Sequence, residues 1–191
     1  VRQCAACQPI NLPRTDALQQ TINRLYGIGG TSQVRFTNVT SYSLTDLGNY
    51  LSGISPTPNP DSPTSEPDVT ATPTFGVSDD ISRANWVVVL LQDVPTPNNP
   101  FRRLLAERPD LLRGKQVIVF SLGAPYYLSS SEIVQISAYY ALYGRTTPFI
   151  ETAARLLFQE LNATSASPVS IPASGYNLPA RLLPAPNQRI R

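Results

Sequence analysis

A short run with an unbroken apolar centre, residues 116–121, constrains the fold more than any other stretch of the chain. Its Val, Ile and Phe residues do not alternate with polar ones, which is typical of a strand that is covered on both faces. Gly123 and Pro125 then break the run, and Ser129 and Glu132 have the spacing of a capping box at a helix N-terminus. The stretch predicts a buried parallel strand in a sheet flanked by helices.

A second apolar run at residues 86–91 predicts another such strand. Between the two runs, Asn99 or Pro100 leads into a helical pattern through residues 101–105. A strand, a helix and a strand in this order form a right-handed parallel crossover. We therefore expect the runs at 86–91 and 116–121 to be neighbouring strands.

The flanking segments continue the alternation of helices and strands. Apolar spacing predicts a helix that starts at Thr15 or Asp16, and another that follows Thr146 with apolar positions through Leu161. Residues 33–39 alternate and predict a strand. This rhythm is typical of a doubly wound α/β domain.

The pattern at residues 43–51 predicts a short capped helix. The stretch Pro168–Pro172 predicts an edge strand or an extended arm, because proline lacks the amide donor that a central strand needs. The fold class we expect is α/β, a three-layer sandwich with a mostly parallel central sheet of about five to six strands. The edge strand near 168–172 is part of that expectation.

The 191 residues fit one domain. We expect a boundary segment at 1–12, a single α/β domain at 13–178 and a tail or linker at 179–191. Within the domain, six of the twenty residues at 55–74 are proline, and most of the others are Ser, Thr, Asn or acidic residues. Such a stretch cannot bury enough apolar surface to offset its ordering entropy, so we expect a surface loop.

Two residue types are absent from the chain, methionine and histidine. A chain without Met at position 1 is expected to be a piece of a longer protein. Without histidine, the chain cannot assemble a Ser-His-Asp or Cys-His nucleophile system. Zinc sites also lose their commonest nitrogen ligand. We expect no metal site and no cofactor.

Charge and hydropathy exclude two classes of partner. The net charge is only +2, and the basic residues are scattered rather than clustered as a nucleic-acid reader requires. No apolar run approaches the ~20 residues that cross a bilayer. We therefore expect no nucleic-acid partner and no membrane-spanning segment.

Two local patterns invite a chemical interpretation. Cys4 and Cys7 form a C-x-x-C, which is found in redox pairs and zinc knuckles, but no further ligands or strand-to-helix context accompany it, and an incidental pair is favoured. Asp79 and Asp80 are adjacent carboxylates. Consecutive residues point apart, whereas a glycosidase pair faces one sugar, so loop solvation or helix capping is favoured.

The second half of the chain resembles the C-terminal domain of family 3 glycoside hydrolases, on the β-N-acetylhexosaminidase side. The resemblance is carried by a strand ending in Ser-Leu-x-x-Pro-Tyr, a tyrosine-containing strand or turn, a helix with paired alanines and a Pro-Val-x-Ile-Pro arm. The matching positions are Ser121, Leu122, Pro125, Tyr126, Tyr143, Ala153, Ala154, Phe158, Glu160, Pro168, Val169, Ile171 and Pro172.

The resemblance implies an accessory, non-catalytic domain that packs on an upstream catalytic barrel of the same parent chain, with carbohydrate as a further candidate partner. The parent would be a retaining glycosidase, secreted or associated with the cell envelope. In the family the nucleophilic Asp belongs to the barrel, and the hexosaminidase branch uses an Asp-His pair on a barrel loop. A chain without histidine cannot hold that pair, and we expect it to be inactive alone.

Two alternatives remain open. Some β-glucosidase-like relatives take an acid/base Glu from this domain, and Glu66 in the proline-rich loop is the candidate here. The other alternative is a stand-alone sugar- or metabolite-binding module, whose site would lie outside the carboxyl ends of the strands. Its candidate substrate-binding residues are Gln92, Asp93, Tyr126 and Tyr127.

Tyr139, Tyr140 and Tyr143 form a cluster that is open to the same two interpretations. Sugars stack on aromatic faces, but a tyrosine at a sheet edge also packs its ring and sends its hydroxyl to a partner. Core or interdomain packing is the favoured interpretation for this cluster.

Overall fold

A computed structural model of the chain describes residues 15–53, 76–92, 98–123, 125 and 128–163. Three parallel strands form its sheet in the order β1-β2-β3, with β1 at Trp86–Leu91, β2 at Gln116–Ser121 and β3 at Ala138–Ala141. β1 and β2 are neighbours, with Val87 opposite Val117 and Leu90 opposite Phe120. This confirms the predicted pairing and its parallel direction.

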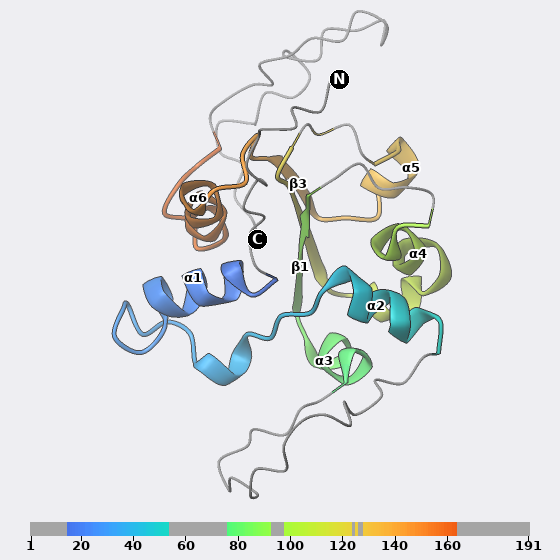
Figure 1. Ribbon diagram of the computed structural model, residues 1–191, viewed down its shortest axis with the longest axis horizontal. Helices are drawn as coiled ribbons and strands as arrows, with labels where there is room; N and C mark the ends of the chain where they lie inside the picture. The colour runs from blue at the N-terminus through green and yellow to red at the C-terminus, as the bar shows by residue number, and fades with distance from the viewer. Residues whose placement is uncertain (1–14, 54–75, 93–97, 124, 126–127, 164–191) are drawn as a thin grey trace, which may run out of the picture.

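Helices lie on both faces of the sheet (Figure 1). On one face are α1 (Ala17–Tyr26) and α6 (Thr147–Leu157). On the other are α2 (Leu44–Leu51), α3 (Val77–Arg83) and α4 (Pro100–Glu107). The short α5 (Ser130–Ile133) lies beside α4, and two 3-10 turns, Phe36–Asn38 and Pro109–Leu112, complete the described elements. The α/β class is as predicted.

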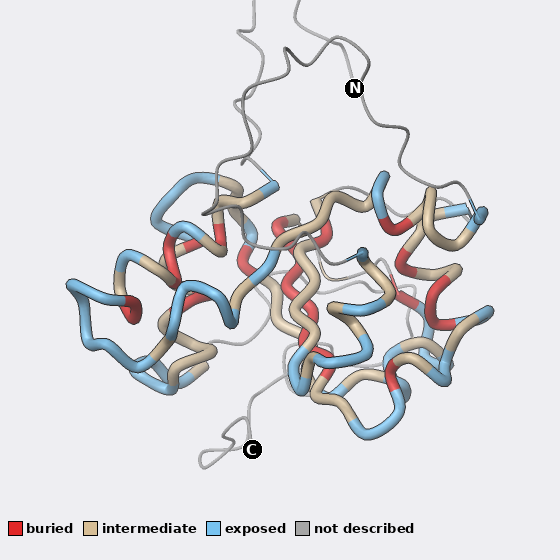
Figure 2. Tube along the Cα trace, turned by 90° about the horizontal axis from the view of Figure 1, so that it is seen from below, coloured by how far each residue is buried: buried red, intermediate tan, exposed pale blue. Residues whose placement is uncertain are grey.

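The core is divided by the sheet into two apolar clusters. The fully buried side chains of Ile118 and Phe120 pack with α1 and α6, whereas Val117 and Val119 pack with α2 and α4. Alternate residues of one strand thus enter opposite clusters. Figure 2 shows the buried residues concentrated on the central strands and on the inward sides of the helices.

Several predicted helix boundaries are confirmed by their capping contacts. The Ser129 N–H donates to Glu132 Oε2 at 2.7 Å, which is half of the predicted capping box. Asn99 caps α4 through its side-chain oxygen, which accepts from the Phe101 N–H at 2.9 Å. Ser43 and Asp46 form a second capping box at α2.

The predicted strand at residues 33–39 is wrong. The chain there forms a 3-10 turn, in which the Asn38 N–H donates to the Arg35 carbonyl at 2.9 Å. The cause lies in the preceding turn, where Val34 donates its N–H to the Tyr26 carbonyl at 2.8 Å. The backbone donor that a strand would use is thereby committed to the end of α1.

The expected sheet of five to six strands is not supported, because the described residues contain three strands. The predicted edge strand at 168–172 lies outside the described residues, as do the proline-rich stretch 55–74 and the terminal segments 1–12 and 179–191. The last helix also ends earlier than its apolar spacing suggested. α6 stops at Leu157, and Gln159 adopts a left-handed conformation with φ of 59°.

Candidate functional site: a groove beside β1

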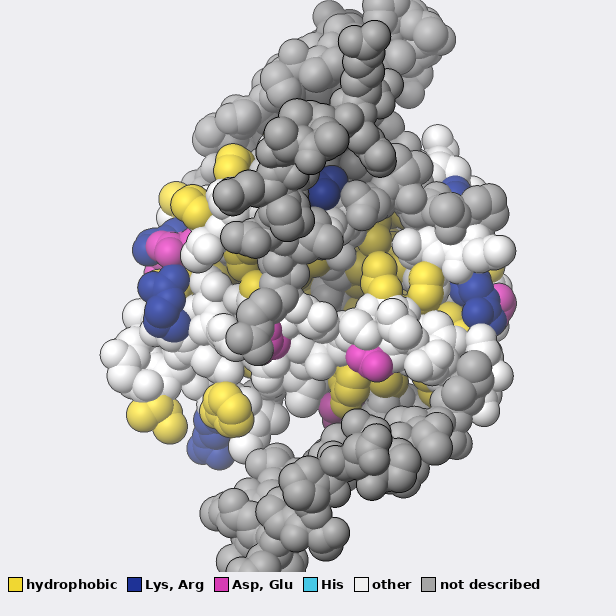
Figure 3. All heavy atoms as spheres, viewed as in Figure 1, with side chains coloured by type: hydrophobic (Ala, Val, Ile, Leu, Met, Phe, Trp, Pro, Cys, Tyr) yellow, Lys and Arg dark blue, Asp and Glu magenta, His cyan; other side chains and the backbone are white. Residues whose placement is uncertain are grey.

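A groove of about 640 Å³ runs along the outer edge of β1. Its walls come from both layers of helices, with Leu18 and Ile22 of α1 on one side and Leu47 of α2 and Ile81 of α3 on the other. Figure 3 shows hydrophobic side chains gathered near the middle of this face of the molecule. The lining is mainly apolar because the groove opens onto the margins of both core clusters.

The floor of the groove is a strand edge. The carbonyls of Asn85 and Leu91 accept hydrogen bonds from the N–H groups of Gln116 (2.9 Å) and Leu122 (2.8 Å), so these carbonyls face β2. Successive residues of a strand point their backbone groups in opposite directions, so Trp86, Val88 and Leu90 direct theirs into the groove. Within the described ranges, no other strand pairs with this edge.

A hydrogen bond between two side chains of the groove joins Tyr42 and Asp80. The Tyr42 hydroxyl donates to Asp80 Oδ2 at 2.5 Å. Burial of the phenol, and then this hydrogen bond to a carboxylate, raise the pKa of Tyr42 well above its usual value. Asp80 lies in the first turn of α3, where the helix dipole favours a negative charge. It is the one charged side chain among the described residues that line the groove.

Only part of the predicted site can be placed in the structure. Gln92 follows β1, is half-buried and lines the groove. Asp93, Tyr126 and Tyr127 lie outside the described residues, as does Glu66. The structure therefore brings Gln92 to the groove and leaves the other candidate residues as predictions. Cys4 and Cys7 are likewise outside the described part of the chain.

Two members of the tyrosine cluster are packing residues, as favoured above. Tyr140 stacks on Phe120 with ring centroids 5.5 Å apart, and Tyr139 packs against the cluster on the opposite face of the sheet. Burial raises the pKa of Tyr140. Tyr143 is different: it is partly exposed just after β3 and has a left-handed φ of 55°.

The carboxylates of the described glutamates are held by arginines. Arg102 binds Glu132 through two contacts, from Nε to Oε1 at 2.6 Å and from an Nη to Oε2 at 3.0 Å. These contacts, helped by the backbone and hydroxyl of Ser129, lower the pKa of Glu132 to about 2. On the surface, Arg103 pairs with Glu107 at 2.8 Å and lowers the pKa of that carboxyl as well.

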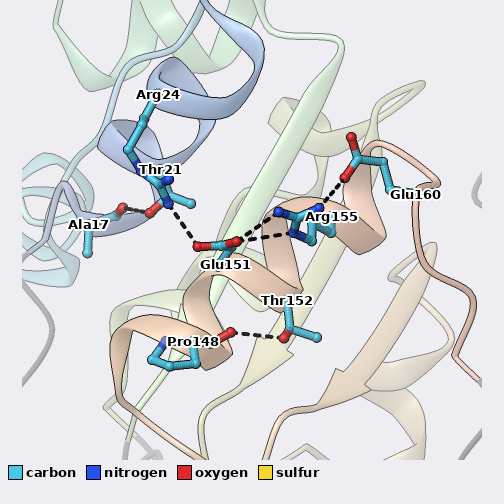
Figure 4. A network of polar contacts seen from close by, with 8 residues as sticks. All are labelled: Ala17, Thr21, Arg24, Pro148, Glu151, Thr152, Arg155 and Glu160. Atoms are coloured by element: carbon cyan, nitrogen blue, oxygen red, sulfur yellow. Dashed lines mark hydrogen bonds and ion pairs between the residues drawn. The ribbon is translucent and has the colours of Figure 1, made fainter. Parts of the chain in front are cut away.

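The other two described glutamates lie in or just after α6, and one of them, Glu151, joins α6 to α1 (Figure 4). Glu151 of α6 accepts from Arg24 of α1 at 2.9 Å and from Arg155 at 2.9 Å, and both arginines lower its pKa. Arg155 also contacts Glu160 at 2.9 Å. These side chains are exposed or half-exposed, so the network ties the helices together at the surface.

The described ranges contain no group of three or more His, Cys, Asp or Glu side chains arranged to hold a metal ion. None of the helices in these ranges has the length and hydropathy required to cross a bilayer.

Sequence reasoning missed the contact between Tyr42 and Asp80. The two residues are 38 positions apart, in segments that show no shared pattern. Only the folding of the segment before α2 against α3 brings them together. A local signal was present for Asp80 alone, since an acidic residue at the start of a helix predicts capping or dipole stabilisation.

Comparison of the chain with models of protein families, with curated proteins and with solved structures gave no match.

Proposed function

We propose that this chain is the accessory, non-catalytic C-terminal domain of a family 3 glycoside hydrolase and that it packs on a catalytic barrel outside the chain. The proposal is supported by the resemblance at Ser121, Leu122 and Pro125 and by the helix with Ala153 and Ala154. The α/β class of the structure is compatible with it.

The non-catalytic part of the proposal is supported by the lowered pKa values of carboxyl groups in the described part of the chain. A glycosidase acid must hold its proton near neutral pH, so its pKa has to be raised. The described carboxyls with a shifted pKa are all shifted downward by arginines, namely Glu107, Asp110, Glu132 and Glu151. Groups of this kind stabilise a fold, and they are poorly suited to donate a proton.

The chemistry would then belong to the rest of the parent protein. In a retaining hydrolase a carboxylate nucleophile forms a covalent glycosyl intermediate, which water then hydrolyses. The proposed parent is a β-N-acetylhexosaminidase-like enzyme that supplies both the nucleophile and its acid/base from the barrel. The role of the present domain would be to support the barrel through packing.

We also propose that the complete sheet has five to six strands. The outer edge of β1, with which none of the described strands pairs, supports a larger sheet, because an unpaired edge is a liability that proteins normally cover. The arm at Pro168–Pro172, with an apolar residue at every second position, is a candidate for one of the missing strands.

The test is hydrolysis of chromogenic N-acetylglucosaminide and glucoside substrates by the purified 191-residue chain and by a longer protein that includes the residues encoded upstream. We expect turnover by the longer protein only. Turnover by the 191-residue chain alone, at a rate well above that of a buffer blank, contradicts the accessory role.

A second function, a stand-alone binding module for a sugar or small metabolite, is favoured by the size of the groove. Its volume of about 640 Å³ falls within the range of small-molecule sites, and Gln92 offers an amide to a polar ligand. A panel of sugars and metabolites that leaves the melting temperature unchanged argues against this alternative. The remaining alternative is that Glu66 acts as a donated acid/base in the parent enzyme, which the pH dependence of kcat/KM of Glu66→Gln in the longer protein tests.

A further inference from the structure

The outer edge of β1 has no partner among the described strands, and the direction of the chain at the end of α6 leads to the groove along this edge. The inference rests on the larger sheet proposed for this domain and is independent of the glycosidase role. The backbone groups of Val88 and Leu90 face the groove, where no described strand pairs with them. The side chains of these two residues contact the cluster under α1 and α6. A strand placed in the groove could therefore form backbone hydrogen bonds with β1 and pack its side chains against the apolar lining.

The handedness of parallel crossovers gives the direction of the chain after α6. The chain moves from β1 to β2 through α4 and from β2 to β3 through α5, and the pairing of Arg102 with Glu132 joins these two helices on one side of the sheet. α6 follows β3 but packs on the opposite side, against α1. A right-handed crossover on the opposite face steps across the sheet in the opposite direction. The next parallel strand is therefore expected beyond β1, not beyond β3.

The end of α6 agrees with this direction. Leu157 and Phe158, at its C-terminal end, line the groove. A helix of 11 residues spans about 16 Å, which returns the chain from the carboxyl edge to the amino edge of the sheet. The residues that follow α6 thus start beside the groove, at the end where a strand parallel to β1 must begin.

The sequence pattern of residues 168–172 fits an edge position. Successive residues of a strand turn their N–H groups to opposite sides, so Pro168, Ser170 and Pro172 share one side and Val169 and Ile171 share the other. If Val169 and Ile171 face β1, both prolines turn their missing donors to the outside, where no partner is needed. Five residues span about 17 Å, close to the length of the six-residue β1.

Charge is also compatible with this occupant. The groove holds one charged side chain among the described residues, the carboxylate of Asp80. Residues 164–191 contain three arginines and no acidic residue. The attraction is weak at long range, but no like charge opposes docking.

We propose that residues 168–172 of this chain occupy the groove as a fourth strand, parallel to β1, with the N–H groups of Val169 and Ile171 directed at its outer edge. The groove is then an internal docking site for the chain's own C-terminal segment. This occupant would exclude a small-molecule ligand from the same space.

The test is residue-resolved hydrogen exchange of the full 191-residue chain, measured at the amides of Val88 and Leu90. We expect both amides to be protected in the native chain. Ile171→Pro removes a donor that faces β1 and should accelerate their exchange by at least about tenfold. Ser170→Pro removes a donor that faces outward and should change the exchange less than about twofold.

The control amide is that of Leu142, which donates to the Ser121 carbonyl at 2.8 Å beside the interior strand. It should stay protected in both variants. If Ile171→Pro unfolds the chain and Leu142 loses protection too, the native chain supplies the answer through nuclear Overhauser contacts between Leu90 and residues 169–171. The presence of these contacts supports the proposal, and their absence overturns it.

Three other outcomes also overturn the proposal. One is rapid exchange of Val88 and Leu90 in the native chain, and another is an equal effect of the two proline substitutions in folded protein. The third is protection that rises with protein concentration, because the edge is then covered by a second copy of the chain.

Discussion

Arg102 and Glu132 join the N-terminal turns of α4 and α5 through two nitrogen–oxygen contacts of 2.6 and 3.0 Å. The side chain of Glu132 is only 15% exposed, so its charge depends on this partner. The pair ties together the two helices that connect the three strands. Of the ion pairs between described side chains, it is among the least exposed.

Replacing Glu132 should destabilise the chain. Glu132→Gln leaves the Arg102 guanidinium without its carboxylate and should lower the free energy of unfolding by about 1–3 kcal/mol. Urea unfolding followed by circular dichroism measures the change. The matched control is Glu107→Gln, which breaks an exposed pair within one helix and should cost about 0.5 kcal/mol or less. Equal effects of the two substitutions would contradict the structural role of the half-buried pair of Arg102 and Glu132.

The same pair predicts a pH dependence. Folding lowers the pKa of Glu132 from its usual 4.5 to about 2, so this group contributes stability above about pH 4.5. That contribution is lost as the pH falls through about 2. Unfolding free energies measured between pH 5 and about 2.5 should therefore fall less steeply for Glu132→Gln than for the native chain. Parallel curves would show that the carboxylate gains no such stabilisation on folding.

The contact between α1 and the end of α6 should depend on a pair of aromatic rings. Tyr26 stacks on Phe158 with ring centroids 3.6 Å apart and an angle of 12° between the rings. Phe158→Ala removes that contact and should cost about 2–3 kcal/mol. Phe36→Ala serves as the control, because Phe36 is 65% exposed and its truncation should cost less than about 1 kcal/mol. The reverse order of the two effects would contradict the described packing.

The turn after α1 should not tolerate a side chain at Gly30. A Cβ atom at this position would lie 2.2 Å from the Leu25 carbonyl oxygen, a backbone atom that cannot move away cheaply. Gly30→Ala should lower the free energy of unfolding by about 1–3 kcal/mol. At Gly76 a Cβ would meet nothing within 4 Å, so Gly76→Ala should have an effect within about 1 kcal/mol. Thermal unfolding of the two variants compares them directly.

The sequence predicted those strands and helix starts that depend only on neighbouring residues. The unbroken apolar run at 116–121 and the serine and glutamate of the capping box at 129–132 specify a strand and a helix start without reference to distant residues. The run at 86–91 also forms the predicted strand, and its parallel pairing followed from the helix between the runs. It is less covered than 116–121, because most of β1 is half-buried and Trp86 is 43% exposed. In these segments local preference and tertiary packing agree.

The wrong strand prediction at 33–39 and the missed contact between Tyr42 and Asp80 have a different cause, which is tertiary structure. The alternation at 33–39 suggested a strand, but the turn after α1 commits the Val34 N–H to the Tyr26 carbonyl and tightens the following residues into a 3-10 turn. The pairing of Tyr42 with Asp80 depends on segments 38 positions apart. Neither the groove nor its open edge could be seen in the sequence, because both depend on which strands are neighbours.

The most direct test of the accessory role is the pH dependence of kcat/KM for the longer protein that includes the upstream residues. Glu66→Gln and Glu107→Gln are compared with the unmodified protein on a chromogenic N-acetylglucosaminide. If the domain is non-catalytic, both variants keep both limbs of the profile and change kcat/KM less than about threefold. Loss of one limb in Glu66→Gln, with Glu107→Gln unchanged, would contradict the account, because this domain would then donate the acid/base.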